Sequence, residues 1–239
     1  MDYTTRLAAG GRWPADVELW HLHIPAAASE RDWPWLDAGE QTRAARYRQP
    51  ADRIRFALTR SRLRQLLAAR LDMSPAALRF VSNPWGRPEL AGGAGLAFNV
   101  SHGGDHALIA LSAARQVGVD IEWIDPALDW QALTGMVCTA AEMRAILAQP
   151  RWRHRQCFFQ CWTAKEALLK ACGLGIGAGL LGLELVHLGL EAREGEDAGG
   201  SLMLKGRSLH YHWLGDISGY GACIAYGQAL SLEPGFPGE

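Results

Sequence analysis

Three acidic residues carry the clearest chemical signal in this sequence. Asp120 and Glu122 lie in the segment 118–122, which reads Gly-Val-Asp-Ile-Glu and predicts a strand. Residues two apart on a strand point to the same face, so these two carboxylates lie side by side. Glu166 belongs to the segment 158–170, which predicts a helix. Three such carboxylates are the hard oxygen ligands that a magnesium ion takes when it also binds phosphates and water, so we expect a metal site here.

Two lysines flank the third carboxylate. The chain has only three lysines against twenty-one arginines, and Lys165 and Lys170 lie on either side of Glu166. Lysines beside a metal ion neutralise the remaining charge of a bound phosphate. Each motif alone has an ordinary alternative, namely a solvated strand face and a helix-surface ion pair worth ~0.3–0.5 kcal/mol. The combination of the two favours a functional site.

The composition is that of an ordinary globular protein. The 239 residues could form one larger domain or two small ones with a shared core. The five cysteines are scattered and include no C-x-x-C pair, so we expect no structural zinc site of that kind. No targeting segment and no apolar stretch of membrane-spanning length is evident. These observations favour a protein of the reducing cytoplasm.

Positive charge is concentrated in one part of the chain. Residues 40–70 hold nine arginines against two acidic residues, whereas the whole chain has a net charge of −1. Such a cluster indicates either a polyanionic partner of limited size or an ordinary solvated helix face.

Hydrophobic periodicity predicts an α+β chain of two similar halves, divided near residue 115. Each half begins with a strand, continues with helices and ends with antiparallel strands, and Gly103-Gly104 predicts a hairpin turn in the first half. The helices are expected at 37–48, 51–71, 129–135, 139–148 and 152–171. The strands are expected at 17–24, 78–82, 96–101, 106–112, 117–122, 183–188, 201–205, 208–215 and 220–227.

The two motifs resemble those of the Sfp-type (surfactin-synthetase-type) 4'-phosphopantetheinyl transferases, and among them the subgroup with a W-x-x-K-E-A helix. The family pattern is a G-x-D-x-E strand followed about forty residues later by W-x-x-K-E-A/S-x-x-K, and residues 118–122 and 162–170 match it. The resemblance spans roughly residues 40–176. Its further motifs are an arginine helix, an N-x-x-G-K/R-P turn and an F-N-x-S-H strand end, which correspond to residues 52–56, 83–88 and 98–102.

This resemblance implies a fold and a reaction. It implies two pseudo-symmetric α+β halves with antiparallel sheets in one monomer, and an active site at their interface. Residues 1–115 would contact the 3'-phosphate and adenine of coenzyme A, and residues 116–239 would hold magnesium and dock the carrier. The enzyme would be of the holo-[acyl-carrier-protein] synthase type. It would transfer 4'-phosphopantetheine from coenzyme A to a serine of an acyl or peptidyl carrier protein and release adenosine 3',5'-bisphosphate, with no nucleic-acid or membrane partner.

The resemblance also implies roles for individual residues. Glu166 would accept the serine proton, directly or through water, and Lys170 would bind the pyrophosphate. Lys165 would contact a phosphate or add to the positive field. The 3'-phosphate would bind to cationic and hydroxyl side chains, since guanidinium grips phosphate in a bidentate fork. The residues expected there are Arg43, Arg55, Arg87, Ser101 and His102.

Three positions depart from the family pattern. Gly103 stands where Ser or Thr is usual, Arg87 replaces the commoner lysine, and Glu40 falls near a position that is often basic.

Two other classes of function remain as alternatives. A nucleic-acid-binding module could use the arginine-rich helix as a phosphate rail, but the acidic residues would then repel the partner. A non-catalytic coenzyme A-binding or scaffold protein would not need the three carboxylates.

Two histidine pairs are spaced like metal ligands. His21/His23 and His210/His212 lie two residues apart on expected strands, but no third ligand is evident in the sequence, which favours surface or half-buried histidines.

Apolar residues after the acidic strand predict a carrier-docking surface. Met136 and Met143 are on the two short helices expected there, and the alternative is packing against the helix at 152–171.

Overall fold

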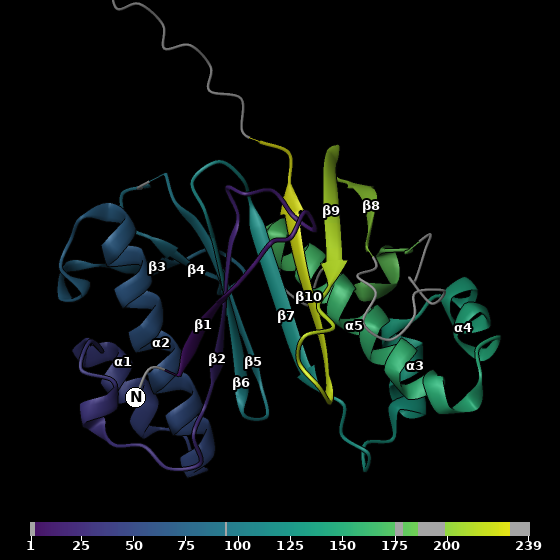
Figure 1. Cartoon of the computed structure of the whole chain (residues 1–239), viewed down its shortest axis with the longest axis horizontal. Coiled ribbons are helices and arrows are strands. Elements are labelled where there is room, and N and C mark those ends of the chain that lie inside the picture. The colour runs from purple at the N-terminus through teal and green to yellow at the C-terminus, as the bar shows by residue number, and fades with distance from the viewer. Residues whose placement is uncertain (1–2, 94, 175–178, 186–198, 230–239) are drawn as a thin grey trace, which may run out of the picture.

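Two antiparallel sheets with helices on their outer sides form the molecule (Figure 1). The computed structural model describes residues 3–93, 95–174, 179–185 and 199–229. The first half contains β1 (Thr4–Leu7), β2 (Glu18–His23), α1 (Ala38–Ala45), α2 (Pro50–Leu71), β3 (Phe80–Ser82), β4 (Pro88–Leu90), β5 (Ala97–Gly103) and β6 (His106–Ser112). The second half contains β7 (Val117–Trp123), α3 (Trp130–Val137), α4 (Ala140–Leu147), α5 (His154–Ala171), β8 (Gly199–Leu204), β9 (Arg207–Trp213) and β10 (Tyr220–Gly227).

The two large sheets share a strand order. The first runs β1-β2-β6-β5 and the second runs β7-β10-β9-β8, with every neighbouring pair antiparallel. In both, the strand immediately before the helices (β2 or β7) pairs with the last strand of that half (β6 or β10). That last strand pairs in turn with the strand before it (β5 or β9). β1 and β8 are the strands added at the outer edges. The prediction of an α+β chain with two similar halves is confirmed.

Each face of the two large sheets packs against apolar side chains, and this packing determines the order of the layers. α2 covers the outer face of the first sheet, and α5 covers the outer face of the second (Figure 1). The inner faces pack on each other through buried side chains of β2, β6, β7 and β10, such as Leu19, Leu108, Ile121 and Ile224. With this shared layer on one face and α5 on the other, β7 is almost wholly buried. Its polar residues must therefore find hydrogen-bond partners among other protein groups.

Local signals account for the helices of the first half. Pro50 occupies the first turn of α2, where its missing N–H costs nothing, and Asp72 ends that helix in the left-handed region with φ 51°. Asp37 and Glu40 form a reciprocal capping box at the start of α1. Arg64 is fully buried and donates to both of these carboxylates, at 2.6 Å to Asp37 and 2.7 Å to Glu40. The acidic residue at position 40 therefore has a structural role.

Some expected elements differ from the structure. β1 and β4 were not predicted, since both are very short edge strands without a clear alternating pattern. Of the strand expected at 183–188, residues 183–185 are irregular and the rest lies outside the described residues. In the described part of the chain, no helix combines the length and the apolar character that crossing a membrane requires.

Candidate active site between the two halves

β7 and α5 approach each other unusually closely, because a glycine separates them. Gly118 lies on the same face of β7 as Asp120 and Glu122. A Cβ atom built on Gly118 would lie 2.0 Å from the carbonyl oxygen of Ala167 in α5. The missing side chain brings the backbone of α5 against the strand, so that Glu166 and the two strand carboxylates form one cluster, called here the acidic group.

A lysine and a serine converge on this acidic group from different elements. The Lys170 ammonium, in the last turn of α5, donates to Asp120 Oδ1 at 2.6 Å. Ser101 Oγ, from β5, donates to the same oxygen at 2.8 Å and lies 3.1 Å from Lys170 Nζ. Asp120 is only 2% exposed, so its charge is compensated by these two contacts and not by bulk water. Residues from both halves of the chain thus meet at one carboxylate.

The other two carboxylates of the acidic group hold their protons unusually tightly. Burial, together with the negative charges of Asp120 and Glu166, raises the pKa of Glu122 to about 7, although Lys170 acts in the opposite direction. Burial and Asp120 likewise raise the pKa of Glu166 to about 7, again against Lys170. One ammonium does not compensate three partly desolvated carboxylates. The site therefore favours binding of a further cation.

The donor set fits a hard divalent cation such as magnesium. Asp120 Oδ2 is buried and has no hydrogen-bond partner, which leaves one oxygen of the acidic group uncommitted. Carboxylate oxygens are the ligands that magnesium prefers. Among the described residues, two groups of three side chains bring all their ligand atoms within 4.8 Å of one another, and the acidic group is not one of them. In this structure, the cation that contacts Asp120 is the ammonium of Lys170.

β5 is held against β7 by two features that set the position of Ser101. Asn99 Oδ1 accepts a hydrogen bond from the backbone N–H of Val119 at 2.9 Å. A Cβ atom on Gly103 would lie 2.8 Å from the carbonyl oxygen of Ile121, so a serine or threonine at this position would push the strands apart. The departure from the family pattern at Gly103 therefore has a steric reason. A role for Asn99 was not predicted, although the residue lies in the F-N-x-S-H segment.

His102 points to the other face of β5, and Arg43 and Arg55 lie near it. Neighbouring residues of a strand point to opposite faces, and Ser101 faces the acidic group. Protein around the His102 ring lowers its pKa, and the positive charges of Arg55, Lys170 and Arg43 add to this effect. Arg55 donates to the carbonyl oxygen of Gly104 at 2.7 Å and to Asp52 at 2.6 Å. The structure thus gathers a cationic region next to the acidic group, which suits a second anionic part of a ligand.

Arg87 connects the two halves through backbone carbonyls. Its guanidinium donates to the carbonyl of Lys170 at 2.6 Å and to that of Phe98 at 2.7 Å, with a longer contact of 3.4 Å to Val117. Burial lowers its pKa. These hydrogen bonds tie the end of α5 to β5, so the structure gives Arg87 a structural task in addition to its expected contact with phosphate.

Lys165 lies away from the acidic group. Its side chain is 0% exposed, and its ammonium donates to Glu142 Oε2 at 2.6 Å and to the carbonyl of Val137 at 2.7 Å. Glu142 also caps α4 by accepting from the N–H of Thr139. The expectation that Lys165 contacts a phosphate has no support in this geometry, because the lysine faces the α3–α4 side of α5. This buried partner could not be recognised from sequence spacing.

Comparison with known proteins agrees with this geometry. A family model described as the 4'-phosphopantetheinyl transferase superfamily matches residues 116–225, which include the acidic group and Lys170. The chain is 32% identical over 184 residues to the 4'-phosphopantetheinyl transferase HetI of Nostoc sp., covering 75% of this chain and 76% of HetI. It is 31% identical over 188 residues to a phosphopantetheinyl transferase of Thraustochytrium sp., covering 70% and 64% of the two chains. A Synechocystis sp. protein provisionally named as a 4'-phosphopantetheinyl transferase is 38% identical over 147 residues, and the match spans 60% of that protein's length.

Proposed function

This chain belongs to the 4'-phosphopantetheinyl transferase superfamily, and on that premise we propose that it is an Sfp-type enzyme. The reaction is magnesium-dependent transfer of 4'-phosphopantetheine from coenzyme A to a serine of an acyl or peptidyl carrier protein. The observation that carries the proposal is the meeting of Ser101, Asp120 and Lys170, with Glu122 and Glu166 beside them, at the junction of the halves. One chain supplies both sides of this junction, which supports activity as a monomer.

The reaction is a displacement at phosphorus. The carrier serine oxygen bonds to the β-phosphorus of coenzyme A, the bond from that phosphorus to the bridging oxygen breaks, and adenosine 3',5'-bisphosphate leaves. Such transfers depend on positioning and on neutralisation of charge. Asp120, Glu122 and Glu166 would hold the magnesium ion. When bound, the ion neutralises the pyrophosphate and stabilises the leaving group.

The chain's own residues carry the other tasks. Glu166 would accept the serine proton, directly or through a water molecule. Lys170 is already within 2.6 Å of Asp120, where its ammonium can pair with a pyrophosphate oxygen. Ser101 Oγ, held between these two groups, can donate to the same phosphate. Such contacts would hold the phosphate in place for attack by the carrier hydroxyl.

The cationic region on the other side of β5 is proposed to bind the 3'-phosphate of coenzyme A. Arg43 is exposed, Arg55 is half-buried, and both lie near His102. Dephospho-coenzyme A should bind at least about tenfold more weakly, because a charge-assisted hydrogen bond contributes ~1.5–3 kcal/mol. Calorimetry of both ligands with the wild type and with Arg43→Ala measures this. Equal affinity of the wild type for the two ligands would place the 3'-phosphate elsewhere.

The carrier is proposed to dock on the short helices after β7. The structure separates the two methionines expected there: Met136 is 61% exposed, whereas Met143 packs against the core of the second half. Arg144 on α4 is exposed and can pair with an acidic carrier helix. We expect Met136→Asp to raise KM for the carrier without changing coenzyme A affinity, and Met143→Asp to lower stability. An unchanged KM in Met136→Asp for every carrier tested would exclude this surface.

The arginines of α2 do not form the phosphate rail that a nucleic-acid-binding module needs. Arg64 is buried against Asp37 and Glu40, and Arg60 lies 3.5 Å from Glu40. Ion pairs also engage Arg53 and Arg70 on this helix. The positive charges of the segment are therefore largely compensated within the protein.

Intact-protein mass spectrometry tests the proposed reaction. Several apo carrier proteins are incubated with the protein, coenzyme A and magnesium, and a parallel reaction contains excess chelator. We expect a gain of one phosphopantetheine on a carrier serine, abolished by the chelator. If no class of carrier gives this product although the protein binds coenzyme A, the result would favour a non-catalytic coenzyme A-binding protein. A product formed equally well in chelator would contradict the assigned metal dependence.

A further inference from the structure

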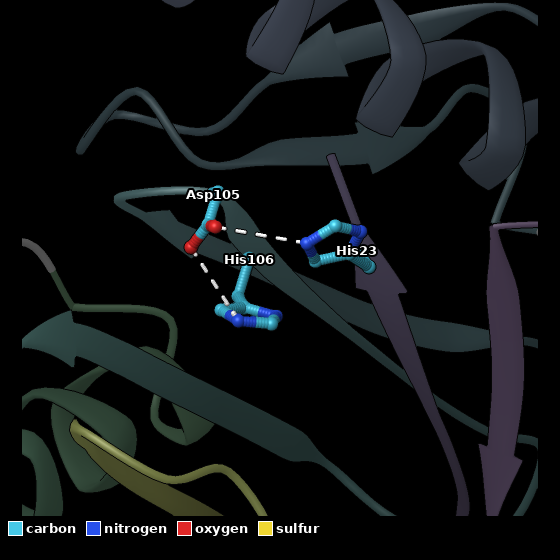
Figure 2. A group of neighbouring side chains, drawn as sticks. All are labelled: His23, Asp105 and His106. Carbon is cyan, nitrogen blue, oxygen red and sulfur yellow. Dashed lines mark ion pairs between the residues drawn. The ribbon is translucent and has the colours of Figure 1, made fainter. Parts of the chain in front are cut away.

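A second set of metal-binding side chains lies on the first sheet, apart from the acidic group. His23 ends β2, His106 begins β6, and Asp105 lies in the turn between β5 and β6 (Figure 2). One ligand atom from each of the three lies within 4.8 Å of the others. Figure 2 shows the two imidazole rings and the carboxylate directed toward a common space.

The donor atoms lie close to the spacing of a tetrahedral site. His23 Nε2 lies 3.6 Å from Asp105 Oδ2, and His106 Nε2 lies 3.4 Å from Asp105 Oδ1, so each imidazole faces a different oxygen of the carboxylate. Zinc bonds to nitrogen and oxygen of about 2.0–2.2 Å in a tetrahedral site place neighbouring ligand atoms ~3.3–3.6 Å apart. Since one ligand atom from each residue lies within 4.8 Å of the others, rotation of the side chains would bring three donors to this spacing around one ion.

The strand register creates this arrangement. His23 and His106 are directly opposite each other in the β2–β6 ladder. The sequence offered His21/His23 and His210/His212 as spaced pairs, with no third ligand evident for either, and favoured surface or half-buried histidines. Two of the three ligands proposed here, Asp105 and His106, come more than eighty positions after His23, and the antiparallel pairing of β6 with β2 brings them alongside.

Residues around the three ligands hold them in place. His21 Nε2 lies 2.7 Å from His106 Nδ1, and the two rings stack with centroids 4.8 Å apart. This contact leaves Nε2 of His106 facing Asp105. Tyr220, from β10 of the other half, hydrogen-bonds to the Asp105 carboxylate. Such outer contacts fix the orientation of ligating imidazoles and carboxylates in metal sites.

The described residues contain one other group of three metal-ligand side chains, and a lysine already occupies it. Cys138, Glu142 and Cys161 are all buried, and the Lys165 ammonium is 2.6 Å from Glu142. That group already contains its cation. In the described part of the chain, no lysine or arginine forms an ion pair with Asp105, and the side chains of His23 and Asp105 are each 58% exposed.

We propose that His23, Asp105 and His106 bind a divalent transition-metal ion of the zinc class, at a site separate from the acidic group. Two imidazoles and one carboxylate are the ligand types that zinc accepts, with the fourth position open to water. Magnesium prefers an all-oxygen environment, so the two sites select different ions.

Binding would join β2 to the turn that follows the strand of Ser101 and His102. The same turn is already fixed by Arg55, which donates to the Gly104 carbonyl, and by Tyr220. An ion that binds the folded protein and not the unfolded chain raises the melting temperature. We therefore expect micromolar zinc to stabilise the wild type.

Cobalt substitution tests the site directly. The metal-free protein is titrated with Co²⁺, whose visible absorption reports tetrahedral coordination, and zinc is then added as a competitor. We expect a visible band from one tetrahedral cobalt ion per chain in the wild type, and loss of the band in His23→Ala and in Asp105→Asn. His21→Phe should weaken binding by about 10–100-fold, the usual effect of removing an outer partner of a ligating histidine.

Two control variants separate this site from others. His210→Ala removes a histidine of the second sheet that stacks on Tyr226, and Glu166→Gln removes a member of the acidic group. Both should retain the cobalt band and the zinc-induced rise in melting temperature. Absence of binding in the wild type, a band that persists in His23→Ala, or a band lost in Glu166→Gln would each overturn the proposal.

Discussion

A single methyl group on β7 should disrupt the site. In Gly118→Ala, the new Cβ would lie 2.0 Å from the carbonyl oxygen of Ala167 and 2.4 Å from the backbone nitrogen of Ala171. Both atoms are backbone, so no side chain can rotate away. To reach even the 3.0 Å limit below which real contacts essentially never occur, α5 must move by about 1 Å from the strand.

This movement would act on activity and stability together. Glu166 precedes Ala167 directly, and Lys170 depends on α5 for its 2.6 Å contact with Asp120. A displacement of about 1 Å at a reacting group can lower the rate about 100-fold. Overpacking of a well-filled core costs typically ~1–3 kcal/mol, so we expect the free energy of unfolding to fall by that amount or more.

A glycine elsewhere in the same half provides a matched control. Gly135 lies inside α3, and a Cβ there would meet no atom within 4 Å. Gly135→Ala should leave the transfer rate at saturating carrier unchanged, because it lies away from the acidic group, and stabilise the protein by about 0.5–1 kcal/mol through helix propensity. Denaturant unfolding and carrier transfer assays measure both variants. A Gly118→Ala enzyme with wild-type stability and rate would refute the close contact between β7 and α5.

Three further variants test particular contacts. Arg87→Lys should lower the free energy of unfolding by ~1.5–3 kcal/mol, because lysine lacks the guanidinium fork in which a separate nitrogen donates to each of the carbonyls of Lys170 and Phe98; unchanged stability with a raised KM for coenzyme A would indicate phosphate binding alone. Lys165→Met should cost ~3–5 kcal/mol by leaving Glu142 buried and unpaired, and Lys165→Met combined with Glu142→Leu should recover much of this loss; a small effect of the single variant would contradict the buried pair. Glu166 has a folded-state pKa of about 7 against an ordinary 4.5, so its contribution to stability is complete below pH 4.5 and disappears as pH rises toward 7. In chelator at pH 8, Glu166→Gln should therefore melt at a higher temperature than the wild type, and a lower melting temperature would exclude the raised pKa.

Short-range periodicity was enough to predict which side chains share a face within β7 and within α5, whereas the meeting of the two elements was expected only from the family resemblance. Asp120 and Glu122 are two residues apart on β7 and therefore point to the same face. Glu166 and Lys170 are four residues apart on α5, so they lie one turn apart on the same side of the helix. The bounds of α2 and β10 were also close to those of the structure, because Pro50 and strong apolar patterns define them. In these cases the local sequence was enough to predict the bounds of an element and the direction of its side chains.

The remaining features depend on contacts between distant segments. Lys165 and Lys170 carry the same charge in the same helix, yet one pairs with Glu142 in the core and the other with Asp120 in the site. The sequence could not show which face of α5 meets which partner. Asp105 and His106 became neighbours of His23 only through the register of β6 with β2. Side-chain direction on a known element was predictable, whereas the partner across the fold was not.

Single-turnover transfer of phosphopantetheine to an apo carrier protein tests the central claim most directly. Rates are measured at saturating coenzyme A and magnesium for the wild type, Asp120→Asn, Glu166→Gln and Glu184→Gln, the last being an exposed carboxylate outside the site. We expect a loss of at least about 100-fold in the first two variants, because electrostatic stabilisation is removed, and the wild-type rate in Glu184→Gln. Wild-type rates in Asp120→Asn and Glu166→Gln would show that the acidic group does not carry the reaction.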